Sequence, residues 1–462
     1  LWGVVFCVCL MLCVVCVVCA SDPLYPYAWH LHSVNGSTSH MNVEAVWQRQ
    51  ITGKRVTLVM VGGAVNEQGD LDEKENLGFH NNGNDDDMSF SSSSLSSSLL
   101  FSPSTRTHRL AIAIGASNHL CSRGVAYNAR YAISPYPAKD CEWLLHTAKQ
   151  QTSSPQSLIA VIDYTSSHIA PSTPNTHKCH THTQKASDAG IIILTHSGYN
   201  DNNCNTDNYI NSPYTISVGG YDINYKPTQT QNPCANVLIS APAGQPWMMI
   251  DAAQGNGVCG GGFGSGVSMM NAAGVVALLM EASGYILSPR DVAHILIETA
   301  RHPTEIKWKK NGGGTLYHPL FGLGVVDALS AVYRASVYLP TYGPLIEHQQ
   351  NLPQHTTFQP STSVTSSIHL PASISGILER VSVWVNISHP SPSDLSITLT
   401  SPSMTKCIFA SATNPVVFGY GHLKTSIGSS VLTTPVKIWS QKSHNYLNQI
   451  EKEDIWRVHL MP

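Results

Sequence analysis

The chain has 462 residues, of which 42% are hydrophobic and 12% charged, and its formal net charge is −3. This length allows more than one domain, and the composition is that of a globular chain rather than a disordered one. The charge gives no basis for binding nucleic acid or anionic membranes, because those surfaces are bound through an excess of lysine and arginine.

The first 20 residues form an uncharged apolar segment that ends in Val18-Cys19-Ala20. This pattern predicts a cleaved signal peptide over residues 1–20, and with it a place in the secretory pathway or outside the cell. Because the segment is also long enough to span a membrane, an uncleaved anchor is the alternative. Five of the 12 cysteines lie in it, so seven remain, and disulfide pairing of these leaves one over.

Apolar strands alternate with helices in the next part of the chain. Residues 56–61, 157–162 and 190–194 are runs rich in valine and isoleucine, as expected for strands buried on both faces of a parallel sheet. A helix is predicted to begin after Ser288, where serine, proline and an acid suit the N-cap, N1 and N3 positions. The alternation predicts an α/β fold with a doubly wound parallel sheet.

Three stretches have a different composition. Residues 76–105 are rich in Asn, Asp and Ser, which predicts a disordered insertion. Residues 177–182 read HKCHTH, but no second ligand cluster stands at zinc-site spacing, so we expect a loop of exposed residues, with a structural metal as the alternative. Residues 381–388 and 394–400 alternate with period two, which predicts β-strands.

Residues 264–282 read GSGVSMMNAAGVVALLMEA. They resemble the nucleophile segment of subtilisin/kexin-type serine proteases (peptidase S8), in which G-T-S-A-x-A-P-x-A-A-G opens a long buried helix. Residues 22–33, 41–61 and 318–332 match further stretches of that family in the same order. Residues 385–402 resemble the P (Homo B) domain that follows the catalytic domain in kexin-like convertases.

The resemblance implies a domain order. A subtilisin-like S8 domain of α/β fold would span residues 21–336, interrupted by the insertion at 76–105. An all-β, jelly-roll P domain would span residues 342–462, and whether it is complete at Pro462 is left open.

The catalytic positions of the family do not hold catalytic residues in this chain. Subtilisin-type proteolysis uses Asp, His and Ser in that order, with an asparagine that stabilises the oxyanion. The aspartate aligns with Gly62, the histidine with Pro103, the serine with Gly266 and the asparagine with Tyr199. The resemblance therefore implies a pseudoprotease.

Neighbouring side chains are poor substitutes. His108 lies five residues after Pro103 and so on a different face of the expected helix. Ser268 lies about 200° around a helix from Gly266. We expect Ser265 and Ser268 to serve as an N-cap and as a hydroxyl on the helix surface.

Other positions match residues that the family uses for folding and binding. Asp22 and Asp70 align with carboxylates of a structural calcium site, which backbone carbonyls near Cys121 would complete, although ordinary surface acids are the alternative. By the same resemblance Cys121 would pair with Cys259.

The resemblance also implies a second disulfide, between Cys204 and Cys234. Asp207 aligns with an aspartate that reads the basic P1 side chain, but the acidic loop that supplies further charges is absent, which weakens the case for multibasic substrates. Asn35 and Asn386 lie in N-x-S sequons and are expected glycosylation sites.

Three hypotheses remain from the sequence. The leading one is a secreted, non-catalytic homologue that binds a protein or peptide, such as an active convertase or its substrates. It would meet a membrane only through an uncleaved N-terminal segment or a further C-terminal anchor. The alternative is an active calcium-dependent serine endopeptidase that processes proproteins, with its triad obscured by errors at residues 62, 103 and 266. The third is a chain that is not folded or not expressed.

Overall fold

The computed structural model describes residues 22–61, 71, 102–134, 157–163, 176–198, 212–229, 231, 237–255, 257–311 and 314–339, and seven strand segments beyond residue 363. The predicted signal peptide at residues 1–20 lies outside the described residues.

A six-stranded sheet with the order β2-β1-β3-β4-β5-β6 forms the centre of the fold. All neighbouring strands in it are parallel. Two predicted strands match their observed bounds, while the third, predicted at residues 190–194, is β4 and begins two residues later. The strands are β1 (Val56–Val61), β2 (Arg130–Ser134), β3 (Ser157–Ile162), β4 (Ile192–His196), β5 (Ile216–Tyr221) and β6 (Val237–Pro242).

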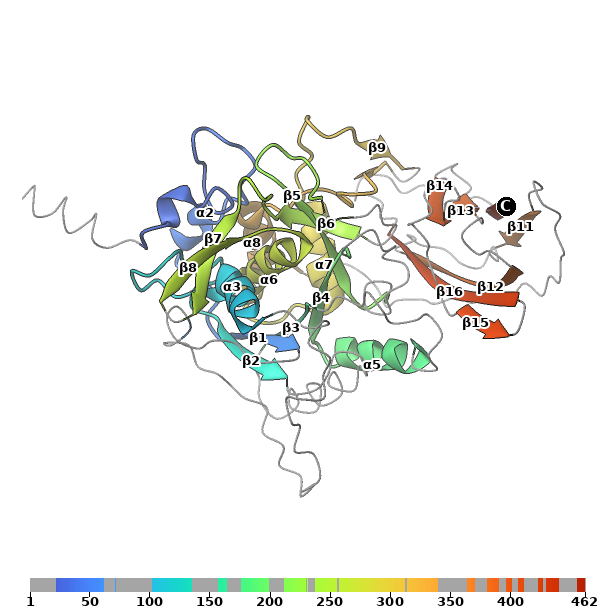
Figure 1. Ribbon diagram of the computed structural model, residues 1–462, viewed down its shortest axis with the longest axis horizontal. Coiled ribbons are helices and arrows are strands. Elements are labelled where there is room, and N and C mark those ends of the chain that lie inside the picture. Colours follow the sequence, from blue (N-terminus) through green and yellow to red (C-terminus); the bar gives the residue numbers. More distant parts are fainter. Residues whose placement is uncertain are drawn as a thin grey trace, which may run out of the picture.

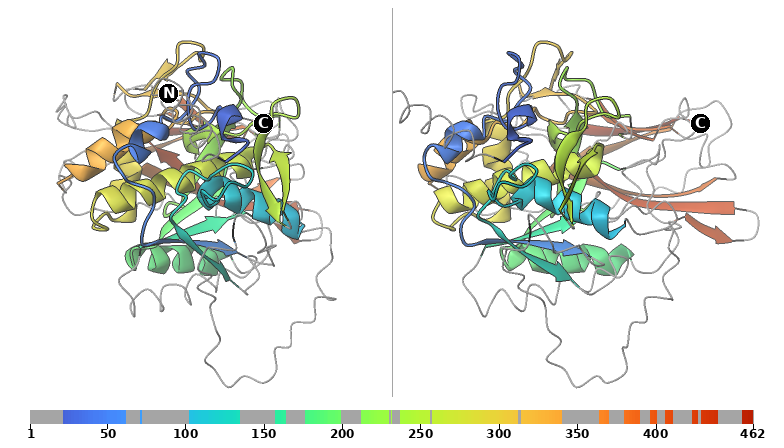
Figure 2. Two further views of the ribbon diagram at one scale, coloured as in Figure 1. Left: turned by 90° about the vertical axis from the view of Figure 1, so that its left-hand side faces the viewer. Right: turned by 60° about the vertical axis from the view of Figure 1, so that its left-hand side comes forward.

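Helices cover both faces of this sheet, which confirms the predicted doubly wound α/β fold (Figures 1 and 2). On one face lies α5 (Thr176–Asp188). The other face carries α3 (Pro103–Ile114), α6 (Ser265–Ala282), α7 (Pro289–Glu298) and α8 (Ala328–Ser336).

The expectation of an exposed loop at residues 177–182 is wrong, because these residues belong to α5. This helix is needed to cover its face of the sheet, and it buries Thr183 and Ala186 completely. The described residues include no group of three His, Cys, Asp or Glu side chains that could hold a metal ion.

Helix α6 is the centre of the hydrophobic core. It is buried from Ser265 to Met280, as expected for a helix that is apolar on every side. A Cβ atom on Gly274 would lie only 2.5 Å from Cβ of Val125, so the glycine permits the close approach of α6 to the segment after α3. Among the described residues α6 is the helix long and apolar enough to cross a membrane, but 89% of it is buried inside the domain.

Helix caps follow the local sequence. The Ser288 hydroxyl accepts the Asp291 N–H at 3.2 Å and the Asp291 carboxylate accepts the Ser288 N–H at 2.9 Å, which is the predicted capping box of α7. At α3, Ser102 caps by accepting the Thr105 N–H at 3.2 Å. The predicted insertion therefore ends before Pro103, since its last three residues are helical; residues 76–101 lie outside the described residues.

Shorter elements complete the first part of the chain. An antiparallel hairpin of β7 (Ile250–Gly255) and β8 (Val258–Gly262) packs against α3. The others are the 3-10 helix η1 (Tyr25–Tyr27), α2 (Glu44–Trp47), and the two-residue strands β9 (Lys309–Lys310) and β10 (Leu316–Tyr317).

The described strands beyond residue 363 pair into antiparallel sheets, with the orders β11-β17-β13-β14 and β12-β16-β15. The strands predicted at 381–388 and 394–400 correspond to β12 and β13, so this part is β-structured as expected; the jelly-roll P domain and the domain boundaries stay predictions. The bounds are β11 (Val364–His369), β12 (Arg380–His389), β13 (Ser396–Thr400), β14 (Lys406–Ala410), β15 (Leu423–Ser426), β16 (Ser429–Trp439) and β17 (Ile455–Met461).

Candidate active site

The first turn of α6 holds the position aligned with the nucleophilic serine. The helix begins at Ser265, and its N-cap is Gly264, whose φ of 99° is a backbone conformation that favours glycine. Gly266 follows inside the first turn and is buried. This position offers a backbone but no hydroxyl for attack on a carbonyl carbon.

Both serines beside Gly266 are buried and hydrogen-bonded to backbone. The Ser265 hydroxyl donates to the Gly198 carbonyl at 2.8 Å, and the Ser268 hydroxyl donates to the Ser265 carbonyl at 2.8 Å. The expectation of an N-cap serine and a surface hydroxyl is therefore wrong, because Gly264 is the N-cap and the core surrounds α6 on all sides. Both hydroxyls are thus engaged with backbone carbonyls.

Helix α3 begins at Pro103, the position aligned with the catalytic histidine. Five residues further on, His108 is buried, with its Nε2 atom 2.9 Å from the carbonyl oxygen of Ile250 in β7. Burial lowers the pKa of His108 to about 4, so the ring is neutral near pH 7. A Cβ on Gly262 would lie 2.3 Å from the His108 ring, so β8 lies directly against the imidazole. His108 is thus a packed core residue under the hairpin.

Several predicted site residues lie outside the described residues: Gly62, Asp70, Tyr199, Cys204, Asp207 and Cys234. Their roles stay predictions. Asn35 is exposed in a turn, as a glycosylation site requires, whereas Asn386 lies in β12.

A buried ion pair at the carboxyl end of the parallel strands was not predicted. Asp163 directly follows β3, and its carboxylate binds the guanidinium of Arg109 from α3. Both side chains are at most 6% exposed. Arg106 lies nearby, and its pKa is lowered by burial, while Asp163 opposes that shift. An acid directly after a buried strand was a usable signal, because the carboxyl ends of parallel strands line the functional edge of such sheets.

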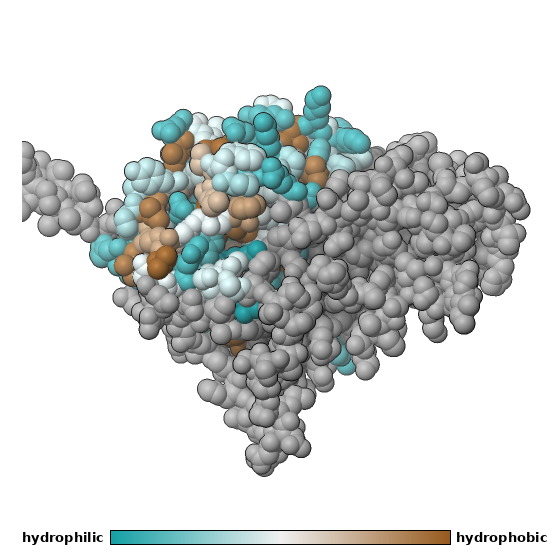
Figure 3. All heavy atoms as spheres, viewed as in Figure 1, coloured by the Kyte–Doolittle hydropathy of each residue, from teal (hydrophilic) through white to brown (hydrophobic). Residues whose placement is uncertain are grey.

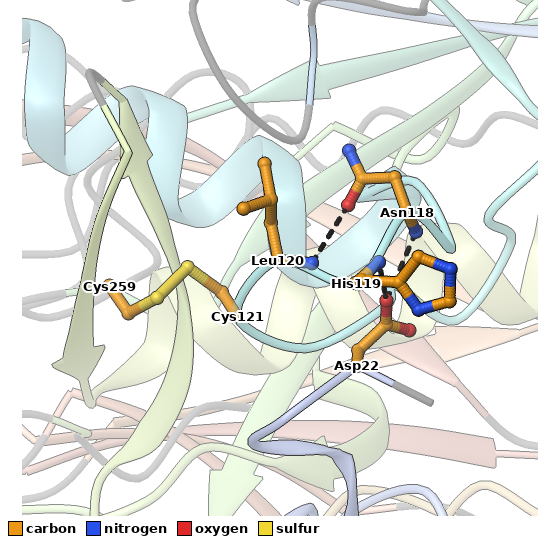
Figure 4. Close-up of a disulfide and its surroundings, with 6 residues drawn as sticks. All are labelled: Asp22, Asn118, His119, Leu120, Cys121 and Cys259. Carbon is orange, nitrogen blue, oxygen red and sulfur yellow. Dashed lines mark hydrogen bonds between the residues drawn. A yellow bond between two sulfur atoms is a disulfide. The ribbon is translucent and has the colours of Figure 1, made fainter. Parts of the chain in front are cut away.

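The implied calcium site can be tested at Asp22, which is buried (Figure 4). Its Oδ1 atom accepts the backbone N–H groups of Asn118 at 3.0 Å and His119 at 2.8 Å. Its Oδ2 atom accepts Nε–H of Arg123 at 2.8 Å. Three donors thus surround a carboxylate that was expected to bind a cation, and these contacts do not fit the role of a calcium ligand.

The same corner of the domain contains the disulfide between Cys121 and Cys259, the pair that the resemblance implied (Figure 4). It joins the loop after α3 to β8, across 138 positions of sequence. The hairpin that covers His108 is thereby fastened to the loop that binds Asp22.

Comparison with known proteins places this fold among the subtilases. The subtilase family model matches residues 107–324, from α3 to the segment before α8. A serine protease of Aeromonas sobria superposes with a TM-score of 0.74 at 16% identity, over 96% of this chain and 89% of that one. The part of the chain built on the parallel sheet is a subtilisin-like peptidase S8 domain.

Within that class, the relatives are convertases. The chain is 26% identical over 415 residues to proprotein convertase subtilisin/kexin type 7 of Homo sapiens, covering 83% of this chain and 52% of that protein. It is 28% identical over 424 residues to the type 6 protein of Rattus norvegicus, covering 84% and 43%. Residues 107–324 belong to the subtilase family, and the chain as a whole is similar to subtilisin/kexin-type convertases, of which it spans about half the length.

Proposed function

We propose that this subtilisin/kexin homologue is a pseudoprotease of the secretory pathway, which acts by binding a protein or peptide rather than by cleaving one. The first turn of α6 carries the proposal. Gly266 has no nucleophile, and the hydroxyls of Ser265 and Ser268 are buried and donate to backbone carbonyls.

The chemistry of the class makes this loss severe. A serine oxygen must attack while a histidine takes its proton and donors stabilise the oxyanion. In subtilisin itself, removal of the serine or the histidine alone lowers turnover about a million-fold. Here α3 starts with Pro103 where the histidine would stand, and His108 is held against the carbonyl of Ile250.

The partner is expected to be a protein or peptide, such as an active convertase or one of its substrates. Proprotein convertase homologues are secretory-pathway proteins, so both would be encountered there. On the described part of the face in Figure 3, apolar side chains are scattered among hydrophilic ones, so composition alone does not single out a docking surface there.

The test is covalent labelling of the purified, secreted full chain with a fluorophosphonate probe, beside an active convertase as the positive control. No labelling of the folded wild-type chain is expected. The variant Gly266→Ser is also expected to stay unlabelled, because the activating histidine is still missing. Stoichiometric labelling of wild type that is lost in Ser265→Ala or Ser268→Ala would overturn the proposal and identify the nucleophile.

Binding is tested separately, because a chain that neither labels nor binds has no function of this kind. Adding the purified chain to an active kexin-type convertase is expected to change the rate at which that enzyme cleaves a multibasic fluorogenic peptide. An unchanged rate, together with no retention of the convertase or of its peptide on the immobilised chain, would contradict a role in binding them.

A further inference from the structure

The environment of Arg123 differs from that of an ordinary surface arginine. Its side chain is 18% exposed, and its guanidinium lies between the Asp22 carboxylate and three aromatic rings. The guanidinium carbon is 4.9 Å from the ring centre of Tyr25, 5.7 Å from that of Trp47 and 5.7 Å from that of Tyr127. Carboxylate and ring faces are both places where a cation is stabilised. The position is therefore built to hold one positive charge.

The rings also contact one another. Trp47 contacts Tyr25 at 5.9 Å and Tyr127 at 5.3 Å between ring centres. Its indole N–H donates to the Val125 carbonyl at 2.9 Å. The three rings are thus held by contacts with one another and with the backbone, as well as by the guanidinium.

Arg123 joins three segments that are distant in sequence. Asp22 and Tyr25 come from the N-terminal segment, Trp47 ends α2, and Arg123 lies in the loop that follows α3. A backbone hydrogen bond from the Leu24 N–H to the Cys121 carbonyl, at 2.7 Å, runs beside it. The charge therefore acts where the N-terminal segment is attached to the domain.

A calcium ion does not fit the same place. Calcium takes about six to eight oxygen ligands. Both oxygens of the Asp22 carboxylate already accept N–H groups, three in total, and the Oδ1 atom of Asn118 in the same loop accepts the Leu120 N–H at 3.2 Å (Figure 4). A bound calcium would have to displace Arg123 and would meet N–H groups that point toward it.

We infer that the guanidinium of Arg123 replaces the structural calcium that the family would hold at Asp22. The family is generally calcium-binding, and the stabilisation that an ion bound from solution gives to a fold falls toward zero as its free concentration drops below its dissociation constant. A guanidinium that is covalently attached to the chain is present at every calcium concentration. The N-terminal segment is therefore held to the loop after α3 without calcium. This inference is independent of whether the chain cleaves peptides.

The experiment is hydrogen–deuterium exchange on the secreted full chain, in excess calcium and in excess EDTA. Peptides covering residues 22–31 and 115–125 report on this corner alone, so calcium bound elsewhere in the chain does not confuse the result. In the wild-type chain both peptides are expected to exchange at the same rate with calcium and with EDTA.

The variants Arg123→Gln and Arg49→Gln form a matched pair, because Arg49 is exposed. Exchange in the two peptides is expected to become about tenfold faster or more in Arg123→Gln, since a buried carboxylate loses its counter-charge. In Arg49→Gln it should match wild type. Arg123→Lys, which keeps the charge but loses the planar fork, is expected to lie between them.

Two results would overturn the inference. EDTA-induced loss of protection in these peptides of the wild-type chain would show that calcium holds this corner. Wild-type exchange in Arg123→Gln would show that the guanidinium does not. Should Arg123→Gln fail to fold, the wild-type comparison and the lysine variant still decide the question.

Discussion

Replacing Asp163 with asparagine is expected to destabilise the S8 domain more than removing its partner Arg109. Asp163 interacts with two buried cations. It binds Arg109 directly. Burial and repulsion from Arg109 lower the pKa of Arg106, and the negative charge of Asp163 opposes this shift. Asp163→Asn leaves both cations without this counter-charge, and breaking such a buried pair costs about 3–5 kcal/mol.

Removing Arg109 is a milder change. In Arg109→Met the carboxylate of Asp163 still faces Arg106, so the expected loss is about 1.5–3 kcal/mol, the value of a hydrogen bond to a charged group. The double variant Arg109→Met/Asp163→Asn should be more stable than Asp163→Asn alone, because one of the two cations is gone. The destabilisation by the two substitutions together should thus be smaller than the sum of their separate effects, as expected for residues in one charge network.

The assay is thermal unfolding at neutral pH and one fixed scan rate, since large secreted chains often unfold irreversibly. A shift on the order of 10 °C is expected for Asp163→Asn. The control is Glu298→Gln, because the Glu298–Arg334 pair at 2.9 Å is partly exposed and worth about 1 kcal/mol or less. Equal shifts for Glu298→Gln and Asp163→Asn, or a larger shift for Arg109→Met, would refute the reasoning.

Three further predictions concern stability. Cys259→Ser removes the disulfide to Cys121, which closes a loop of 138 residues and is worth about 5 kcal/mol of stability in the chain-entropy model. Secretion should therefore fall sharply, and a wild-type yield would contradict this. Gly274→Ala should lower the unfolding temperature, because overpacking costs about 1–3 kcal/mol while the higher helix propensity of alanine stabilises by only about 1 kcal/mol. A raised unfolding temperature would show that α6 can shift to make room for the methyl group. Burial lowers the pKa of His30 to about 3 and that of His108 to about 4, so below about pH 6.5 the unfolded chain binds protons that the folded chain does not. Stability should therefore fall as pH drops from about 6.5 toward 4, by at most about 1.4 kcal/mol per pH unit for each histidine, and His108→Gln should flatten that slope.

What the sequence could predict was local. Strands β1 and β3 were found because their apolar runs are continuous, and the capping box of α7 is complete within four residues. Once residues 264–282 are aligned with the family's helix, the glycine at position 266 can likewise be read from the sequence alone.

Contacts between distant segments could not be read in the same way. Arg109 and Asp163 are 54 positions apart, and Arg123 lies 101 positions after Asp22. The sequence around an arginine does not indicate which distant carboxylate it will bind. The guanidinium beside Asp22 was therefore not predicted, and a calcium ion was expected there instead. Ser268 was expected on the helix surface because it lies about 200° around α6 from Gly266, whereas neighbouring elements bury that side of the helix too.

The burial of α6 from Ser265 to Met280 also bears on how this protein is made. Residues 265–282 are water-compatible only while the sheet, α3 and α8 cover them, since alone they form an apolar segment of nearly membrane-spanning length. On the secretory route proposed above, this segment would emerge before α7 and α8, and its apolar surface would stay uncovered until those helices follow. Variants that loosen the docking of α6 should therefore be retained inside the cell, and reduced secretion should appear before any measurable change in the purified protein.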